Sequence, residues 1–418
     1  MASTNTATTK TATNETASNA ATTAVVDTAA KLRAIATELG QRFYERDDVA
    51  RTLITTVLAG QHSLLLGPPG TAKSELAREL TSRITDARYW ELLLSKFTDP
   101  KRMFGPIDVA ALSQGQYRQV YEGRATQCEI AFLDEIFKCS TAALNETLAL
   151  LNERLYHPEN GGKPISCPLI AAITASNELP SGEDTAAIYD RLLVRIEVGY
   201  LADPSNFASL VRSAVARPAA ATRTTVDLAA LKHAVEVEVP AIEVPEGIVD
   251  AICTLRAGLR RKELIASDRR WRQAVRLLQA SAYLDGRSAV TDTDLAILTH
   301  VLWDSPAERP TVERTVLELV NPDAGKAMDL DDAIIELEAA LDAKAGQSAE
   351  ELSNWGIKEA NPKLKRAGKE LAKLRADAVA AGRSTATLDR VINRQKAVMG
   401  RVLSEALGMD LSDLPSAE

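Results

Sequence analysis

The stretch Gly67-Pro-Pro-Gly-Thr-Ala-Lys-Ser74 lies between an apolar run and a helical pattern. The run His62–Leu66 precedes it, and apolar residues at helical spacing follow it from Glu75 to Ile84. A strand, a glycine-rich turn and a helix in this order are the context of a phosphate-binding loop. The stretch fits the Walker A pattern at every fixed position except one, because Ala72 stands where a glycine usually precedes the lysine.

Backbone N–H groups of such a loop, and of the helix that follows it, converge on phosphate oxygens because both carry partial positive charge. The residues expected to bind a nucleotide in this way are Gly67, Pro68, Pro69, Gly70, Thr71, Ala72, Lys73 and Ser74. We expect Lys73 to reach the β and γ phosphates and the Ser74 hydroxyl to bind Mg²⁺. The Cβ atom of Ala72 requires a negative φ angle there, because only glycine adopts positive φ without steric cost.

A second apolar run, Glu129–Leu133, ends in Asp134 and Glu135, which is the Walker B pattern. Asp134 at a strand end can hold Mg²⁺ through the waters of the ion. Glu135 beside it can act as the general base that activates an attacking water. Acidic pairs also follow strands by chance, but downstream of a phosphate-binding loop this pair predicts hydrolysis of a Mg²⁺-bound nucleotide.

Polar side chains also follow or precede the next two apolar runs. Asn177 follows the run Leu169–Ser176, where its amide either orients a water against the γ-phosphate or forms a turn. Arg191 and Arg195 lie just before the next apolar stretch, Ile196–Val198. A guanidinium that reaches a neighbouring subunit's γ-phosphate accelerates hydrolysis by about 10³–10⁵-fold, although an isolated arginine is more often a surface residue. The continuous apolar runs predict a parallel sheet flanked by helices.

The composition of the chain is that of a soluble globular protein. Its 418 residues are 45% hydrophobic and 25% charged. No apolar run approaches the roughly 20 residues of a membrane helix, so we expect no membrane span. The formal net charge of -8 makes a dedicated nucleic-acid binder improbable, because neutralising phosphates requires a basic surface.

The cysteines show no spacing typical of a metal site, and we expect buried free thiols in a reducing compartment. They are Cys128, Cys139, Cys167 and Cys253. Residues 1–23 consist almost entirely of Ala, Thr, Ser and Asn, which predicts a disordered tail. Because this start lacks the basic and apolar segments of a secretory signal, we expect a cytoplasmic protein.

The patterns predict three structured regions. Residues 24–203 alternate helical patterns with apolar runs and form the expected α/β nucleotide-binding core. Every periodic segment from Leu201 to Asp304 is helical, which predicts an all-α lid over residues 204–305. Pro306 and Pro310 mark a boundary, and the remainder, 306–418, is predicted to be a helical C-terminal region.

In combination, these motifs resemble the MoxR branch of the AAA+ ATPases, and within it the RavA-type group. The resemblance covers roughly residues 34–304, and the segments that carry it are Gly67–Gly70, Phe104–Pro106, Leu133–Ile136, Leu151–Arg154, Asn177–Pro180, Tyr189–Arg191 and Ser267–Trp271. The RavA-type group also has an alanine before the Walker A lysine, as at Ala72.

The resemblance implies an ATP hydrolase with a P-loop AAA+ αβα core, a helical lid and a ring, usually hexameric, with ATP and Mg²⁺ bound at subunit boundaries. It assigns Walker A to Lys73 and Ser74, Walker B to Asp134 and Glu135, and sensor 1 to Asn177. Arg191 corresponds to the arginine finger, with Arg195 as the second choice. Arg270 or Arg269 corresponds to the sensor 2 arginine, which is expected to contact the nucleotide of its own subunit.

The resemblance also implies chaperone-like remodelling, assembly or metal loading of protein complexes, usually with a von Willebrand factor A domain partner. Phe104–Tyr121 occupies the position of the family's helix-2 insert, which faces the ring pore, and Tyr156–Pro168 that of its pre-sensor hairpin. The β-rich module that RavA-type proteins can carry has no counterpart after Pro310, where only helical patterns occur.

The basic stretch Lys358–Arg375 fits either a surface for an acidic partner or membrane, or a solvated helix matched by nearby acids such as Asp331 and Asp332. Other functions on the same core stay open. They are a DNA-acting AAA+ machine, a nucleotide-switched scaffold with little turnover, and a protease-coupled unfoldase. The sequence leaves the client protein and the subunit number undetermined.

Overall fold

The computed structural model describes residues 28–158, 161–215, 223–344, 348–381, 383 and 385–409. By their contacts, the residues form two compact units: Met1–Asp250 with Leu264–Arg309, and Ala251–Glu263 with Pro310–Glu418. Residues 1–23, for which the sequence predicts a disordered tail, lie outside the described residues.

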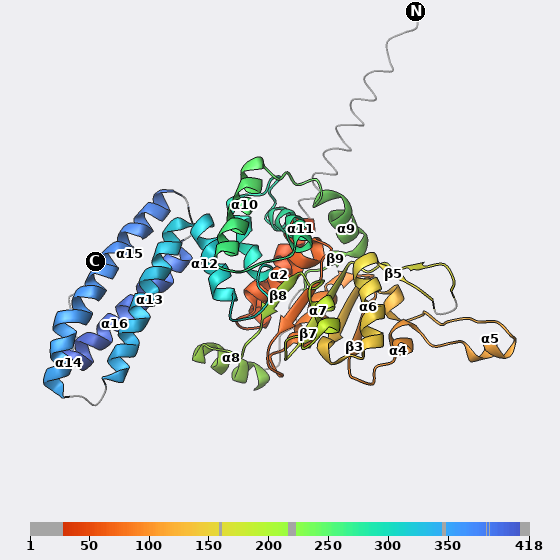
Figure 1. The fold of residues 1–418 in the computed structure, drawn as a ribbon, viewed down its shortest axis with the longest axis horizontal. Coiled ribbons are helices and arrows are strands. Elements are labelled where there is room, and N and C mark those ends of the chain that lie inside the picture. The colour runs from red at the N-terminus through yellow and green to blue at the C-terminus, as the bar shows by residue number, and fades with distance from the viewer. Residues whose placement is uncertain are drawn as a thin grey trace, which may run out of the picture. The chain divides into compact units, whose positions relative to one another are not determined.

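A parallel sheet lies at the centre of the first unit (Figure 1). Its strands are, in spatial order, β3 (Tyr89–Leu93), β4 (Ile130–Asp134), β7 (Ala171–Ser176), β1 (Ser63–Leu66) and β8 (Val194–Glu197). Every neighbouring pair is parallel, which confirms the predicted sheet. The apolar runs did not indicate β3, because this edge strand leaves Glu91 and Leu93 exposed.

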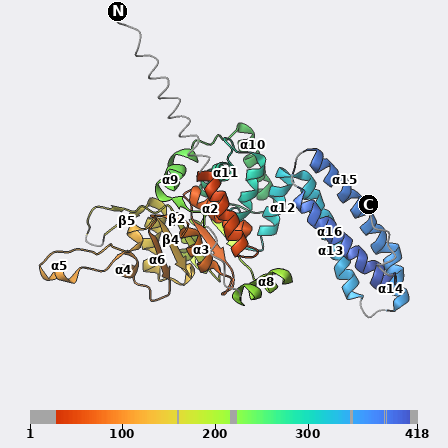
Figure 2. The same cartoon turned by 180° about the vertical axis from the view of Figure 1, so that it is seen from behind.

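Helices cover both faces of the sheet, because successive side chains of a strand point to opposite faces. On one face, Leu64 and Leu133 pack in a buried core with helices of the middle of the chain. These helices are α4 (Pro100–Phe104), α6 (Thr141–Glu153) and α7 (Glu183–Tyr189). Helices α2 (Asp47–Leu58) and α3 (Lys73–Thr81) contact β7 from the other side, and a further helix spans residues 28–42. The predicted αβα core is therefore present, with α7 labelled in Figure 1 and α3 in the reverse view of Figure 2.

Two hairpins extend the core at the positions of the expected inserts. In the first, Ile107 and Gln119 form an antiparallel bridge, and α5 (Val109–Ser113) lies between them in the chain. The second pairs β5 (Leu155–Tyr156) with β6 (Ile165–Ser166). Two short 3₁₀ turns flank β4, namely η1 (Ala125–Gln127) and η2 (Ile136–Lys138).

Helices dominate the remainder of the first unit, as predicted. One short strand was not predicted: β9 (Val226–Asp227), which pairs with β2 (Ile84–Thr85). The helices are α8 (Pro204–Val215), α9 (Leu228–His233), the π-helix η3 (Ala234–Glu238), α11 (Asp268–Leu284) and the 3₁₀-helix η4 (Asp292–His300). Helix α10 (Glu246–Arg261) begins in the first unit and continues into the second.

The second unit is helical throughout its described residues. Its elements are α12 (Arg309–Val320), α13 (Pro322–Ala343), α14 (Ala349–Trp355), η5 (Gly356–Ala360), α15 (Asn361–Ala380), α16 (Ala386–Arg401) and η6 (Val402–Ala406). Leu337, Leu371 and Val391 contribute to a core shared by α13, α15 and α16. The predicted acidic partners of the α15 lysines bind elsewhere, because Asp331 pairs with Arg394 at 3.4 Å and Asp332 with Arg314 at 3.1 Å.

All four cysteines are free, as expected, and three of them are buried. Cys253 is exposed, so the prediction of burial is wrong at that position. Within the described part of the chain, none of the helices combines the length and the apolar character that crossing a membrane would require.

Candidate nucleotide-binding site

The Walker A loop connects the end of β1 to the start of α3 in a conformation that two glycines permit. A Cβ atom at Gly67 would lie 2.1 Å from the carbonyl oxygen of Val198, so no side chain fits beside the chain after β8. Gly70 has a φ angle of 80°, which lies in the left-handed region that favours glycine. The loop therefore passes close to the sheet and turns sharply before α3.

Lys73 folds over the loop with its ammonium group among loop oxygens. Its Nζ atom donates to the carbonyl oxygens of Gly67 and Pro68, both at 2.8 Å, and lies 3.3 Å from the hydroxyl of Thr71. Burial lowers the pKa of Lys73, and attraction to Asp134 and Glu135 counteracts this in part. A positive charge is thus held at the mouth of the loop, where a phosphate can replace the carbonyl oxygens as acceptor.

The first turn of α3 keeps backbone donors available. Ala72 occupies the N-cap position, and no side chain caps this helix end. The N–H groups of the first turn of a helix lack partners within the helix, and the helix dipole adds partial positive charge there. Lys73 is itself the first residue of α3, so its side chain starts from the same helical turn as these donors, as in a phosphate-binding loop.

Ala72 has a φ angle of 63°, so the expectation of a negative angle at this position is wrong. A non-glycine residue in the left-handed region costs about 1–3 kcal/mol and persists where the surroundings impose it. Ala72 is exposed, so its Cβ atom points into open space. The alanine variant of the motif therefore keeps the backbone path of glycine at a local cost in conformational energy.

Two oxygen donors for a divalent cation meet beside the loop. The hydroxyl of Ser74, at the start of α3, donates to Oδ2 of Asp134, at the end of β4, over 3.2 Å. Hydroxyl and carboxylate oxygens are hard ligands, and Mg²⁺ in nucleotide sites is typically bound by one or two protein oxygens, phosphates and waters. The donor set of Ser74 and Asp134 fits Mg²⁺.

Glu135 stands next to this pair in a constrained conformation. Its φ angle of 56° is left-handed, and its carboxylate forms an ion pair with Lys138 at 3.2 Å. The Glu135 side chain is about one-quarter exposed, but the Oε2 atom that pairs with Lys138 is buried. Strained backbone at a strand end is typical of functional positions.

The order of the strands places Asn177 in the same row. The backbone N–H of Gly67 donates to the carbonyl oxygen of Ser176 over 3.0 Å, and Asn177 follows Ser176 as an exposed residue. Since β7 lies between β1 and β4, Asn177 follows the strand between the Walker A loop and Asp134. The sheet thus brings the predicted Walker A, Walker B and sensor 1 positions to its carboxyl edge.

Arg191 lies at the opposite edge of the sheet, the amino edge, where the strands begin. It precedes β8, whose first residue, Val194, pairs in register with Ser63 at the start of β1. The strands separate this amino edge from the Walker A loop by about 10 Å. Arg191 lines a polar cavity of about 110 Å³ together with Arg154 and Gln273. Burial, followed by the charge of Arg269, lowers the pKa of Arg191.

Arg195, the second choice for the arginine finger, is fully buried in its own subunit. Its guanidinium stacks 3.6 Å from the centre of the Tyr189 ring and donates to Asp304 Oδ1 over 2.7 Å. It also donates to the carbonyl oxygens of Tyr189 and Trp303. These contacts hold Arg195 inside the subunit, which favours Arg191 as the arginine that a neighbouring subunit can meet.

The sensor 2 candidates, Arg269 and Arg270, lie near Arg191 and not near the Walker A loop. Arg270 Nη2 lies 2.9 Å from Asp304 Oδ1 and 3.7 Å from Asp190 Oδ1. Arg269 lies 3.9 Å from the other oxygen of Asp190. Asp190 adjoins Arg191 at the amino edge, so the packing of α11 places both arginines against acidic residues of that edge. That Arg270 or Arg269 contacts the nucleotide of its own subunit stays a prediction.

Comparisons with known proteins agree with this geometry. Residues 30–234 match the MoxR domain in the MoxR-vWA-beta-propeller ternary systems, and residues 247–316 match an AAA lid domain. An uncharacterized protein of Methanocaldococcus jannaschii is 33% identical over 369 residues, which cover 87% of this chain and 94% of that protein. The chain belongs to the MoxR family of AAA+ ATPases.

A second uncharacterized protein of the same organism is 33% identical over 300 residues, covering 71% of this MoxR chain and 78% of that protein. A candidate ATPase from Cytophaga hutchinsonii has a similar crystal structure, with a TM-score of 0.58 and 18% sequence identity, over 72% of this chain and 98% of that one. This structural likeness supports the fold of the MoxR chain.

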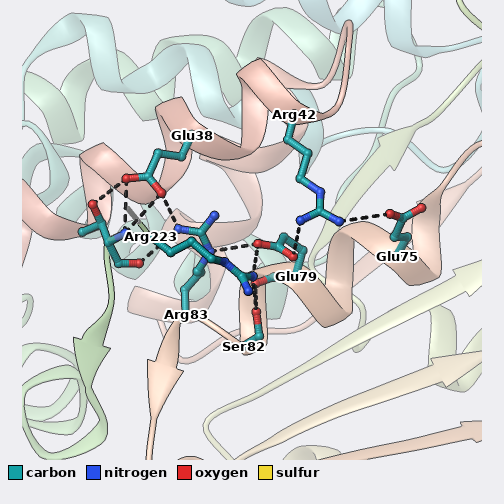
Figure 3. Close-up of polar contacts among 8 residues, drawn as sticks. Glu38, Arg42, Glu75, Glu79, Ser82, Arg83 and Arg223 are labelled. Carbon is teal, nitrogen blue, oxygen red and sulfur yellow. Dashed lines mark hydrogen bonds and ion pairs between the residues drawn. The ribbon is translucent and has the colours of Figure 1, made fainter. Parts of the chain in front are cut away.

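An ion-pair network fixes the helix that follows the Walker A loop of this MoxR chain (Figure 3). Buried Glu79 of α3 accepts hydrogen bonds from Arg42 and Arg83, both at 2.9 Å, and from Arg223. Burial alone would raise the pKa of Glu79, but these arginines lower it. Glu38 binds the other side of Arg83. Three chain segments thereby hold α3, so the donors at its start are held in place before a ligand binds.

Two residues important to the MoxR site were not assigned a role from the sequence. Asp304 joins Arg195 and Arg270, although it lies more than one hundred residues from Arg195 in the chain. Arg154 donates to the carbonyl oxygens of Gly60 at 2.9 Å and Ile170 at 3.2 Å, and burial lowers its pKa to about 10. Arg154 has a positive φ angle and is the one residue between α6 and β5. Neither property can be read from its residue type.

Proposed function

We propose that this MoxR-family chain hydrolyses Mg²⁺-bound ATP. The observation that carries the proposal is the meeting of Ser74 with Asp134 at 3.2 Å beside the Walker A lysine. In this arrangement the loop and the first turn of α3 bind the phosphates, and Lys73 neutralises the β and γ phosphates. Ser74 and Asp134 would hold Mg²⁺, which when bound withdraws charge from the phosphates.

The residues of the carboxyl edge divide the remaining chemistry. Glu135 accepts a proton from the attacking water, since it directly follows Asp134 at the end of β4 and part of its side chain is exposed. Asn177, at the end of β7, orients that water against the γ-phosphate. No cation of the amino edge reaches this position within one subunit, because the strands lie between the two edges.

Arg191 therefore acts on the nucleotide of a neighbouring subunit, where its charge stabilises the transition state. Arg269 lies on the same edge with about half of its side chain exposed, and it would face the same neighbour, whereas Arg270 is buried against Asp304. A site completed in this way calls for a closed homo-oligomer, and we propose a hexameric ring. The hairpin that carries α5 corresponds to the insert that faces the ring pore.

We further propose that hydrolysis drives chaperone-like remodelling, assembly or metal loading of protein complexes in the cytoplasm. The description of the matched family, MoxR-vWA-beta-propeller ternary systems, supports a von Willebrand factor A domain protein as partner. Within the MoxR family, the alanine before the Walker A lysine and the segment Ser267–Trp271 support the RavA-type group.

The variant Glu135→Gln tests this proposal. It removes only the proton acceptor, so ATP binding stays intact while turnover falls by about 10²–10⁴-fold. Binding is measured by calorimetric titration and turnover by phosphate release under multiple-turnover conditions, with Glu236→Gln as an exposed control of equal charge change. A wild-type chain that binds ATP without turnover would instead be a nucleotide-switched scaffold. Mass spectrometry of proteins retained by Glu135→Gln then identifies the partner.

A further inference from the structure

Helix α8 leaves large apolar side chains in solvent. Phe207, Leu210 and Val211 are 58%, 47% and 52% exposed. Their spacing of three and four residues places them on one face of the helix. Both views draw α8 apart from the helices that cover the sheet (Figures 1 and 2). A helix of 12 residues has marginal stability without packing, so this apolar face calls for a covering surface.

The start of α8 is fixed beside the Walker A loop. The hydroxyl of Tyr200 donates to the carbonyl oxygen of Pro69 over 3.3 Å. The carboxylate of Glu45 accepts from the backbone N–H groups of Ala202 and Asp203, both at 2.9 Å. The exposed face of α8 therefore begins at the carboxyl edge of the sheet, next to the residues that bind the nucleotide.

A second exposed apolar residue lies beside Arg191, at the amino edge. Ile265 is 73% exposed and stands shortly before Ser267. The Ser267 hydroxyl donates to Asp190 Oδ1 over 3.0 Å, and Asp190 adjoins Arg191. Ile265 thus lies near Arg191, the proposed arginine finger, and α8 begins near the Walker A loop.

We infer that the apolar face of α8 packs against the Ile265 surface of a second copy of this chain. The inference rests on the proposed function, in which one copy supplies the Walker A loop and the next supplies Arg191. A copy that brings Arg191 to the nucleotide also brings Ile265 to the same edge, where the face of α8 begins. Two different surfaces meet in this contact, so it is head-to-tail, and such contacts close into rings when the rotation permits.

Two groups of variants test the interface. The double variant Phe207→Ser/Leu210→Ser removes the face of α8, and Ile265→Ser removes the opposing surface. Each is expected to weaken self-association by about tenfold or more, because central apolar residues dominate interface energies. Sedimentation velocity over a concentration series with Mg²⁺ and ATP measures assembly. Val237→Ser, at an apolar position that is 52% exposed elsewhere in the same unit, is the matched control and should assemble like the wild type.

Mixing the two variants tests the head-to-tail arrangement. The Ile265→Ser chain keeps an intact α8 and the double variant keeps an intact Ile265. An equimolar mixture should therefore form heterodimers through this one intact contact, whereas each variant alone should associate more weakly. All these side chains are exposed, so the substitutions should preserve folding and ATP binding, which calorimetric titration checks.

Two outcomes overturn the inference. The first is assembly of the α8 variant at wild-type concentrations, because something other than a second copy then covers this face. The second is a mixture that associates no better than its components. Failure of the proposed function looks different. A wild type that assembles through α8 and Ile265 but neither binds nor hydrolyses ATP would refute the nucleotide site, while the interface would stand.

Discussion

The two edges of the central sheet are built in contrasting ways. At the carboxyl edge, Lys73 bonds to carbonyl oxygens of its own loop, and Ala72 and Glu135 are held at positive φ angles. At the amino edge, buried Arg195 is bonded to Asp304, to backbone carbonyls and to the ring of Tyr189. The carboxyl edge is thus arranged to exchange its internal partners for a ligand, whereas the amino edge is a fixed support.

Under the proposed function, one chain carries two incomplete halves of a site, and they correspond to these two edges. The amino edge holds Arg195 and Arg270 with Asp304 and leaves Arg191 at a polar cavity. The carboxyl edge carries the Walker A loop and the pair of Ser74 and Asp134. Two arginines beside it are already engaged, because Arg46 donates to the carbonyl oxygen of Gly199 and Arg309 pairs with Glu197. The comparison predicts that substitutions at the two edges have different consequences. It also predicts that a subunit altered at one edge can restore the activity of a subunit altered at the other.

The largest effect is expected for Arg191→Ala. Hydrolysis should fall by about 10³–10⁵-fold while ATP affinity stays close to that of the wild type, because the arginine stabilises the transition state from a neighbouring subunit. Mixing Arg191→Ala with Lys73→Ala chains should restore part of the activity. Roughly a quarter of the interfaces in a randomly mixed ring then combine two intact halves.

The mixing experiment is read from phosphate release at a fixed total protein concentration, with each variant alone as the control. A mixture that stays as inactive as its two components would contradict a composite site and indicate a structural role for Arg191.

A smaller effect, measured as ATP affinity, is expected for Lys73→Ala. Hydrogen bonds from a charged donor contribute about 1.5–3 kcal/mol, so ATP affinity should fall by about ten- to a hundredfold. Calorimetric titration measures the change, and Lys96→Ala, an exposed lysine after β3, controls for the loss of charge. Equal affinities for Lys73→Ala and the wild type would overturn the assignment of the loop.

Asp304→Asn should reduce the free energy of unfolding by about 1–2 kcal/mol without changing ATP affinity. It removes the carboxylate that joins Arg195 and Arg270, but the Asp304 side chain is 54% exposed, so water partly screens these ion pairs. Chemical denaturation measures the difference, and ATP titration checks the carboxyl edge. A fall in affinity as large as that of Lys73→Ala would show that the two edges are not independent.

The effect of Asp304→Asn should depend on pH. Burial would raise the pKa of Asp304, but Arg270 and Arg195 lower it on balance. A carboxylate with a lowered pKa stabilises the fold above its unfolded pKa of about 3.9 and loses this contribution as the pH falls through its folded value. The difference between wild type and variant should therefore be full at neutral pH and shrink below about pH 4.

The smallest effect is expected for Ala72→Gly. Glycine adopts positive φ without steric cost, but it also adds entropy to the unfolded chain, so the two changes partly cancel. The free energy of unfolding should rise by at most about 1 kcal/mol, as measured by chemical denaturation. A clear loss of stability would mean that the φ angle of 63° costs this residue little.

Local sequence patterns predicted much of the carboxyl edge, because each of its parts is a continuous segment. The Walker A stretch and Asp134 with Glu135 both lie where an apolar strand ends, and hydrophobic burial makes such strands recognisable. The pattern could not reveal the φ angle of Ala72, which depends on how the loop passes the chain after β8. The edge strand β3 was missed because half-exposed strands lack a continuous apolar run.

The amino edge was much less predictable. Arg191, Arg195, Arg269 and Arg270 all looked alike as basic residues near apolar stretches. Their roles differ because β8 buries Arg195 and because α11 carries Arg270 to Asp190 and Asp304. No spacing rule links Asp304 to Arg195, since their contact forms only when distant segments pack together.

The sequence by itself determined the residues of the candidate site: a loop with the Walker A pattern, oxygens that suit Mg²⁺ and a carboxylate beside them. These features are local, and local backbone geometry follows from residue type and hydrophobic pattern. The tertiary structure alone decided which arginine is buried, which edge each cation occupies and where apolar side chains remain uncovered. Such properties depend on contacts between segments far apart in the chain, and those contacts follow from the packing of the whole fold.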